Sequence, residues 1–284
     1  MIKSFEFSMM GVSHDIKELL PFCAEKGFDA IGVPAKIFED EKTAAEYDAM
    51  VKAHGLKWGL LPMPADFYYW DLGEEEFNAA LKELQHRAKV AEKLGIKHAY
   101  NHVWSSGSRE FDENFRWHVE RVKKVTHILK EHGVHYGLEF LGPHELRTFA
   151  PYEFVHSLSG VLAIIDAAGE NTGIAFDSHH WFCSNNADPG DMLWMQTHID
   201  RLVAFHMNDS VEGVPFNEQK DMVRRLPMES GVVNTKELYR RFDIPGNTAL
   251  CMMEPFQPAC GHFASLDPKN TMKEAGIALS RVIK

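Results

Sequence analysis

Apolar and polar positions follow two periods that succeed one another repeatedly along the chain. Stretches with apolar residues at helical spacing, such as Ile16, Leu19, Leu20 and Cys23, predict amphipathic helices. Short continuous apolar runs follow these stretches, and such runs are typical of buried parallel strands. The pattern therefore predicts a chain built from repeated strand and helix units.

Glycine stands at the junction between a helix and the next strand. Helix-like stretches end in EKG, AHG, KLG and EHG, and glycine takes the left-handed conformation of a helix end at the least steric cost. The apolar runs FDAIGV, LKWGLLP, IKHAYNHV and VHYGLEFL follow them. The opening run SFEFSMMG and the later runs GIAFD, LVAFHMN and ALCMMEPF complete a predicted series of eight strands alternating with eight helices.

This alternation predicts the fold class. Parallel strands need crossover helices, and eight such units in 284 residues predict a single (β/α)8 TIM barrel, with residues 1–284 forming one domain. An open doubly wound sheet is the alternative. No G-x-G-x-x-G or G-x-x-x-x-G-K-[ST] motif follows a strand, so the sequence does not indicate the nucleotide sites that these motifs build.

Four polar residues end four successive strands in the second half of the chain: Glu139, Asp177, His206 and Glu254. The C-terminal strand ends of a barrel share one mouth, so these side chains are expected to converge. Three carboxylates and one imidazole suit one divalent metal ion, with Mn²⁺ as our first expectation and Mg²⁺, Co²⁺ or Zn²⁺ as alternatives. Taken singly, each residue has a structural alternative: an ion pair, a core histidine, or a cap for the turn after Asp177.

Such a centre is suited to removing a proton beside a carbonyl group. A dication can hold the carbonyl oxygen and stabilise the enediolate as negative charge develops. Glu139 and Glu254 end strands on different sides of the cavity, so we expect them to act as the acid/base pair. Return of the proton to the opposite face inverts a carbon, whereas return to the neighbouring carbon moves the carbonyl.

Aromatic residues follow the third and fourth strands. His102 and Trp104 end the fourth strand and are expected to line the cavity, where aromatic rings either stack on sugars or fill gaps in the core. The cluster Phe67 to Trp70 follows the third strand as a cavity wall, a lid or an oligomer contact, and the sequence leaves these alternatives open.

Charge and cysteine usage narrow the possible partners. Lys and Arg number 30 against 41 Asp and Glu, and the net charge of −11 argues against nucleic acid and anionic membranes as partners. The N-terminus lacks a signal-peptide pattern, and no apolar stretch is long enough to span a membrane. The 4 cysteines lack C-x-x-C spacing, which favours free thiols and a cytoplasmic location.

The segments GLEFLGPHELRT, FDSHHWF, FHMND, RRLPMESGVVN and MMEPF resemble the xylose isomerase-like TIM-barrel superfamily of sugar phosphate isomerases and epimerases. The nearest resemblance is to ketose 3-epimerases and inosose isomerases, and it is specific over residues 136–256. It implies that Glu139, Asp177, His206 and Glu254 are the metal ligands. It also implies that Glu139 and Glu254 are the acid/base pair.

The resemblance further implies substrate contacts by His180, Arg225 and Glu145, and a homo-oligomer, because relatives are commonly dimers or tetramers. The chain departs from the family at residues 228–230, where Met-Glu-Ser replaces a Pro-Gly-Glu type of turn. The departure leaves the expected metal site intact and leaves the substrate open.

These observations predict a divalent-metal-dependent isomerase or epimerase of a small keto-sugar or keto-inositol. A lyase on the same scaffold is the alternative: an inosose- or 3-dehydroshikimate-type dehydratase, or an enzyme cleaving 3-keto-glycosides. An abasic-site-type metal endonuclease shares the barrel, but the charge of −11 disfavours it. A non-catalytic barrel is the remaining alternative.

Overall fold

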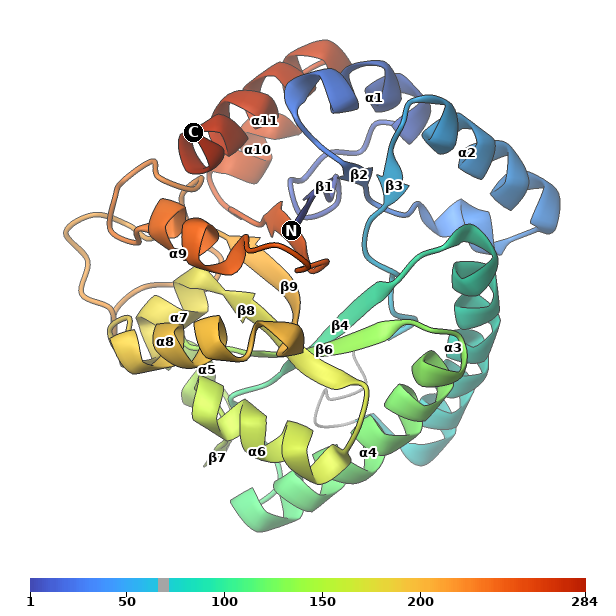
Figure 1. Ribbon diagram of the computed structural model, residues 1–284. Helices are drawn as coiled ribbons and strands as arrows, with labels where there is room; N and C mark the ends of the chain where they lie inside the picture. Colours follow the sequence, from blue (N-terminus) through green and yellow to red (C-terminus); the bar gives the residue numbers. More distant parts are fainter. Residues whose placement is uncertain (66–71) are drawn as a thin grey trace.

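The computed structural model describes residues 1–65 and 72–284, and it shows an eight-stranded parallel sheet that curls about a central axis, with helices outside it (Figure 1). The strand order is β3-β2-β1-β10-β9-β8-β6-β4, with parallel pairing throughout. The strands are β1 (Ile2–Phe5), β2 (Ala30–Ile31), β3 (Lys57–Trp58), β4 (His98–Val103), β6 (His135–Phe140), β8 (Thr172–Asp177), β9 (Leu202–Met207) and β10 (Leu250–Met253).

The two ends of the sheet meet just beyond β3. Leu60 forms a parallel bridge with His98 at the start of β4, and the backbone N–H of Leu61 donates to the carbonyl of His98 at 2.8 Å. This contact joins the first and last strands of the sheet. The predicted (β/α)8 TIM barrel is therefore confirmed, and the open-sheet alternative is excluded.

In the described parts of the chain, seven helices connect consecutive strands of the sheet and an eighth follows the last strand, as the sequence predicts, and three further helices lie in segments that follow the C-terminal ends of strands. No described helix combines the length and apolarity that crossing a membrane requires. The connecting helices are α1 (Ile16–Cys23), α2 (Glu41–Ala53), α3 (Glu74–Leu94), α4 (Phe111–Glu131), α6 (Leu158–Ala168), α8 (Pro189–Thr197) and α9 (Thr235–Phe242), and the C-terminal helix is α11 (Pro268–Ile283). The three further helices are α5 (His144–Arg147), α7 (Ser178–Asn185) and α10 (Ala259–Phe263).

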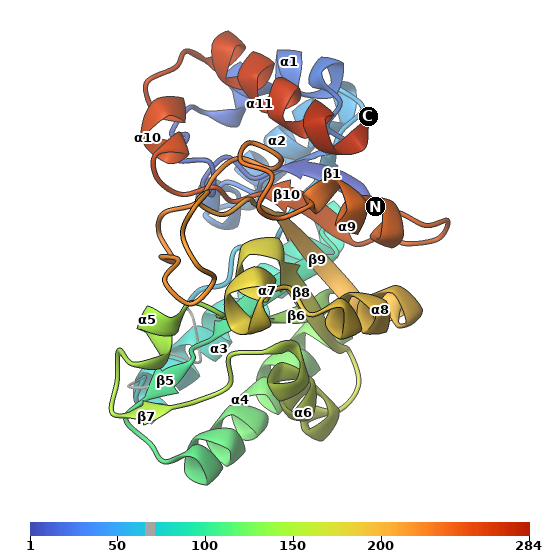
Figure 2. The same cartoon turned by 90° about the vertical axis from the view of Figure 1, so that its left-hand side faces the viewer.

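Figure 2 shows that α5, α10 and the long segment between β9 and α9 lie at one end of the barrel, together with a small antiparallel pair, β5 (Ser106–Gly107) and β7 (Tyr152–Glu153). These elements follow the C-terminal ends of strands. They build the mouth of the barrel, where barrel enzymes place their active sites. The aromatic cluster Phe67 to Trp70 lies outside the described residues.

Polar side chains fix where the helices begin, and glycines fix where several of them end. The side chains of Asp40, Ser157 and Asp267 accept backbone N–H groups at the first turns of α2, α6 and α11. Gly27 and Gly95 have φ angles of 94° and 76° after helical segments, which places them in the left-handed region that the sequence predicts.

The barrel interior below the mouth is filled by a small apolar cluster. Because side chains alternate along a strand, one set points inward and the other packs against the helices. The inward cluster consists of Leu60, Ala175, Ala204, Leu250 and Met252. This layer forms the floor on which the polar residues at the strand ends stand.

A buried histidine at the joint of the barrel predicts a pH effect on stability. Burial lowers the pKa of His98 from about 6.5 to about 4, and the charges of His135 and Lys97 add to this shift. Below pH 6.5 the unfolded chain takes up a proton that the folded chain does not, so stability falls until the pH nears 4. We expect this residue to account for a loss of about 3 kcal/mol across that window.

Urea unfolding of the wild type and of His98→Gln between neutral pH and pH 4 checks this expectation. The variant should lose less stability on acidification than the wild type. His127→Gln, which removes an exposed histidine of α4, should follow the wild type. Parallel pH curves for the wild type and His98→Gln would contradict the assignment.

Candidate metal centre

The alternation of side chains along the strands brings the four predicted ligands into the interior. On β8, Ala175 points inward and Phe176 packs in the outer core, so Asp177 points inward again. On β9, Ala204 and Phe205 do the same before His206. The parallel register places Asp177 directly beside His206. Period-two patterning and register therefore place these side chains one layer above the apolar floor.

The four side chains lie close enough to share one cation. His206 Nδ1 lies 3.2 Å from Glu139 Oε1, 3.3 Å from Glu254 Oε2 and 3.8 Å from Asp177 Oδ2. One ligand atom from each residue can be chosen so that all four lie within 4.8 Å of one another. Metal bonds of about 2.0–2.2 Å place opposite ligands about 4.4 Å apart, so small side-chain adjustments bring this set around one ion.

Unsatisfied polar atoms at the centre fit a metal ion. Both carboxylate oxygens of Glu139 and both ring nitrogens of His206 are fully buried without an aligned hydrogen bond from the described residues. The short separations from His206 Nδ1 are thus ionic contacts without hydrogen-bond geometry. Buried polar atoms normally find partners, because leaving one unpaired costs about 1–3 kcal/mol or more. A divalent cation would satisfy these oxygens and nitrogens together.

The two carboxylate oxygens of Asp177 make different contacts. Its Oδ1 accepts backbone N–H groups of His179 at 2.6 Å and His180 at 2.8 Å, which caps α7. Its Oδ2 accepts from Asn208 Nδ2 and from Arg224 Nη1 on the side of the centre. Asp177 therefore caps α7, which was its structural alternative, and also lies beside the other three predicted ligands.

A buried arginine neutralises part of the negative charge. Arg224 Nη1 lies 2.9 Å from Asp177 Oδ2 and 3.2 Å from Glu254 Oε2. Its Nη2 lies 2.8 Å from Asp221 Oδ1 and 3.1 Å from His180 Nε2. A guanidinium group with its fixed fork of donors suits such a set of acceptors. The arginine thus links two carboxylates of the centre to the long segment that carries Asp221.

The crowding of charges sets the protonation of the centre. Burial disfavours the imidazolium of His206, but Glu139 and Glu254 outweigh burial and raise the pKa of this histidine well above its ordinary value. Burial raises the pKa of Asp177 to about 7, although Arg224 opposes the shift. Burial also acts upward on Glu254, but His206 and Arg224 prevail and lower its pKa to about 2. Each carboxylate thus depends on a neighbouring positive charge.

The two adjacent histidines at the start of α7 face different surroundings. His180 Nε2 lies 3.7 Å from Glu139 Oε1, beside the centre. His179 instead turns its Nδ1 to Ser210 Oγ at 2.8 Å and its Nε2 to the Cys183 sulfur at 3.4 Å. Burial, followed by the charge of Arg224, lowers the pKa of both histidines, which favours their neutral forms.

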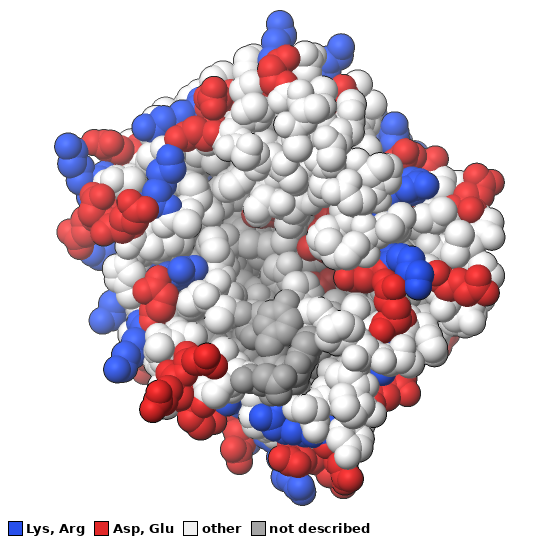
Figure 3. Space-filling model, turned by 180° about the vertical axis from the view of Figure 1, so that it is seen from behind, with Lys and Arg blue, Asp and Glu red and all other residues white. Residues whose placement is uncertain are grey.

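A cavity opens beside the centre at the barrel mouth. Residues that the sequence predicts at the site, including His102, Trp104 and His180, line a cavity of about 190 Å³ together with Arg224 and Phe256. His102 Nε2 lies 3.4 Å from Glu139 Oε2, so this ring borders both the cavity and the four-residue centre. Figure 3 shows this end of the barrel as a hollowed face with acidic atoms visible in its wall.

The structure places Arg224, rather than the predicted Arg225, at the centre. Among the described residues, the Arg225 side chain donates one hydrogen bond, from Nη1 to the backbone carbonyl of Arg224 at 3.2 Å, and the Arg225 backbone pairs with Asp209. In extended backbone, neighbouring side chains point to opposite sides, so Arg224 and Arg225 point apart, and a substrate contact of Arg225 stays a prediction.

Glu145 contacts the long segment between β9 and α9. Its Oε1 accepts the backbone N–H of Asp221 at 2.8 Å, and its Oε2 pairs with Lys220 Nζ at 3.0 Å. The contact holds Asp221 where it can meet Arg224. In the structure Glu145 thus contacts this segment, and a contact of Glu145 with substrate stays a prediction.

The comparison with known proteins identifies the family. Residues 20–280 match the model of the xylose isomerase-like TIM barrel. The chain belongs to this family. No curated protein matches the sequence.

Solved structures of similar shape agree with this family assignment. A xylose isomerase domain protein from Alicyclobacillus acidocaldarius is 23% identical, with a TM-score of 0.80 over 99% of this chain and 98% of its own. The IolI protein with a bound zinc atom is 18% identical, with a TM-score of 0.78 over 100% of this chain and 98% of its own. D-Psicose 3-epimerase from Clostridium cellulolyticum H10, solved with D-tagatose, is 16% identical, with a TM-score of 0.71 over 99% and 98%. At these identities the likeness shows the fold.

Sequence analysis of this xylose isomerase-like barrel missed four residues at the mouth: Arg224, Asp221, Asn208 and Glu6. Asn208 Oδ1 accepts the backbone N–H of Glu254 at 2.9 Å, while its amide donates to Asp177, so it orients two of the predicted ligands. Glu6 lies within the opening run SFEFSMMG, directly after β1, so the signal of a carboxylate at the end of a strand could have identified it. Arg224 and Asp221 lie in an irregular segment without a period.

The buried arginine gives a test that separates it from its neighbour. Arg224→Met should destabilise the metal-free barrel by about 3–5 kcal/mol, because it leaves two buried carboxylates without their cation. Arg225→Met should cost about 1 kcal/mol or less, because its side chain makes one backbone contact. Urea unfolding in the presence of a chelator measures both effects. Equal losses in the two variants would contradict the assignment of Arg224 to the centre.

Proposed function

We propose that this chain is a divalent-metal-dependent isomerase or epimerase of a keto-sugar or keto-inositol. The observation that carries the proposal is the buried group of Glu139, Asp177, His206 and Glu254 at the barrel mouth, with unsatisfied atoms on two of them. D-Psicose 3-epimerase, a structural neighbour, has the same fold. The family and the donor set together favour this activity over a non-catalytic barrel.

These four residues would hold the metal ion, with Mn²⁺ as the first expectation. When bound, a dication supplies Lewis-acid polarisation of a carbonyl oxygen and offsets negative charge that develops on it. The donor set of three carboxylates and one imidazole matches Mn²⁺ and its relatives, and the zinc bound to the IolI neighbour keeps Zn²⁺ among the candidates.

Glu139 and Glu254 are placed to move a proton on two sides of a bound substrate. They lie on β6 and β10, which are separated in the sheet by β8 and β9. His206 Nδ1 lies between their carboxylates, at 3.2 Å and 3.3 Å. A carbon held above this histidine has a carboxylate on either side, so one can take a proton and the other can return one. Proton return to the other face gives epimerisation, and return to the next carbon gives isomerisation.

Neighbouring groups hold Glu139 and Glu254 in position, and apolar side chains line the adjoining cavity. Arg224 pairs with the Glu254 carboxylate, and the Asn208 side chain accepts the backbone N–H of Glu254. His102 and His180 lie 3.4 Å and 3.7 Å from the Glu139 carboxylate. Trp104 and Phe256 line the adjoining cavity and give it apolar walls that suit the carbon face of a sugar ring.

Metal binding is the first test of this proposal. The wild type should bind one Mn²⁺ in a calorimetric titration, and anomalous scattering should place it among the four side chains. Asp177→Asn and His206→Gln should each weaken binding by at least roughly 100-fold, because loss of a ligand exceeds the 10- to 100-fold effect of losing a supporting contact. Glu131→Gln, on the exposed end of α4, is the matched control. Binding that survives in both ligand variants would reject this centre.

Proton exchange from solvent is the second test. Glu139→Gln and Glu254→Gln should each lower deuterium incorporation from D₂O into a substrate ketose by about 10²- to 10⁴-fold, which is the usual contribution of a general acid or base. D-Fructose, D-tagatose and keto-inositols form the substrate panel. Incorporation with unchanged product mass supports an isomerase or epimerase, whereas loss of one water identifies the lyase alternative. Full exchange in both variants would reject the acid/base roles.

A further inference from the structure

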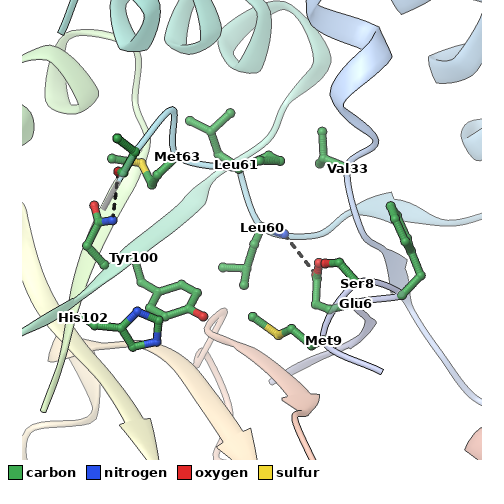
Figure 4. A pocket seen from close by; sticks show the side chains of 13 residues that line it. Glu6, Ser8, Met9, Val33, Leu60, Leu61, Met63, Tyr100 and His102 are labelled. Carbon is green, nitrogen blue, oxygen red and sulfur yellow. Dashed lines mark hydrogen bonds between the residues drawn. The ribbon is translucent and has the colours of Figure 1, made fainter. Parts of the chain in front are cut away.

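A second cavity at the mouth lies over the strands that do not carry the metal centre. It has a volume of about 340 Å³ and is lined by the ends of β1 and β4 and the segments after β2 and β3 (Figure 4). His102 lines both this cavity and the smaller one beside Glu139. The two cavities therefore share His102 as a lining residue, and a substrate that reacts at the centre and passes this ring would extend over β1.

Glu6 is the acidic residue among the described residues that line this cavity. Its Oε1 accepts from Ser4 Oγ at 2.6 Å and from the backbone N–H of Leu60 at 3.1 Å, the contact drawn in Figure 4. No hydrogen bond from the described residues reaches Oε2. One oxygen thus fixes the side chain, while the other stays available at the cavity wall.

Two glycines give this carboxylate its space. A Cβ at Gly32 would lie 2.7 Å from Oε2, and a Cβ at Gly59 would overlap Oε1. These glycines follow β2 and β3, so the neighbouring strands leave room for Glu6 on one side of the barrel. Burial raises the pKa of Glu6, although the hydrogen bonds from Ser4 and Leu60 oppose it. A buried carboxylate is costly to keep, and a donor on the ligand would offset that cost.

We propose, on the basis of the proposed function, that Glu6 is a specificity-determining residue that accepts a hydrogen bond from a hydroxyl of an uncharged polyol substrate. The hydroxyl belongs to the end of the substrate that lies away from the reacting carbons. That end rests over β1, while the reacting end lies between Glu254 on β10, the strand next to β1, and Glu139 on β6.

The charge of the cavity selects against phosphorylated substrates. Neither Lys nor Arg occurs among the described residues that line it. Arg224, in the adjoining cavity, is already engaged by Asp177, Asp221 and Glu254. A phosphate near Glu6 would face a like charge in a half-enclosed space without a counter-cation. An uncharged ketose or cyclitol meets no such penalty.

Calorimetric titration of the Mn²⁺-loaded protein with D-fructose, myo-inositol and D-fructose 6-phosphate tests the proposal. The wild type should bind at least one of the uncharged probes, and bind the phosphate more weakly. Glu6→Gln keeps an oxygen for Ser4 and Leu60 but turns an amide to the cavity, so it should bind the uncharged probe about 10- to 100-fold more weakly. Its urea unfolding curve should match that of the wild type, which excludes a purely structural role.

Two further variants make the test specific to the position of Oε2. Gly32→Ala keeps the charge of Glu6 but displaces Oε2, so it should also weaken binding of the uncharged probe. Glu18→Gln makes the same charge change as Glu6→Gln on the exposed face of α1 and should bind like the wild type. A crystal structure with the tighter probe should show a hydroxyl within hydrogen-bond distance of Oε2.

The outcomes separate this proposal from the proposed reaction. Binding that depends on Glu6 without deuterium exchange from D₂O rejects the reaction and supports the role of Glu6. Exchange that Glu6→Gln leaves unchanged overturns the role of Glu6 and supports the reaction. Failure of the wild type to bind either uncharged probe, or tighter binding of the phosphate, overturns the polyol assignment.

Discussion

The concentration of buried carboxylates at one end of the barrel is the constraint on which the rest of the site depends. Glu139, Asp177 and Glu254 lie within one small volume, and each is at most 4% exposed. Like charges in a poorly solvated space cannot persist without compensation. Arg224 and His206 supply part of it, and a bound dication would complete it. The cap on α7 and the Asn208 amide satisfy remaining oxygens and hold them in place.

The same constraint divides the mouth into two halves. Strands β6, β8, β9 and β10 end in the charged centre, whereas β1 and β4 border a cavity whose one described acid is Glu6. Because the sheet closes through the bridge between Leu60 and His98, the two halves face each other across a fixed width. The parallel barrel thus holds the proposed reacting groups in one half of the mouth and the proposed recognition residue Glu6 in the other.

Sequence periodicity predicts the position of the residues that lie on the strands and on the crossover helices. Alternation places Asp177, His206 and Glu254 inward because each stands two residues after an apolar interior position, as His206 does after Ala204. Glu139 follows Leu138, which packs in the outer core, and so also points inward. Glu6 follows the same alternation, two residues after Ser4. The opening apolar run continues past Glu6, so the end of the strand was hidden in the sequence. The helices α5 and α10 escaped prediction because four and five residues span too few turns to establish a helical period, and α7 escaped because most of its residues are buried, so that it carries no amphipathic stripe.

The long segment between β9 and α9 shows why the remaining part of the site is not encoded in any period. Its shape depends on Asp209, whose carboxylate accepts backbone N–H groups of Ser230 at 2.9 Å, Gly231 at 2.7 Å and Val233 at 2.9 Å. The pairing of Asp209 with Arg225 then fixes which of two adjacent arginines points inward. A shift of this pairing by one residue would exchange the directions of the two arginines, and tertiary hydrogen bonds set the pairing. The segment FHMND thus supplies both a predicted ligand, His206, and the carboxylate that delivers Arg224 to it.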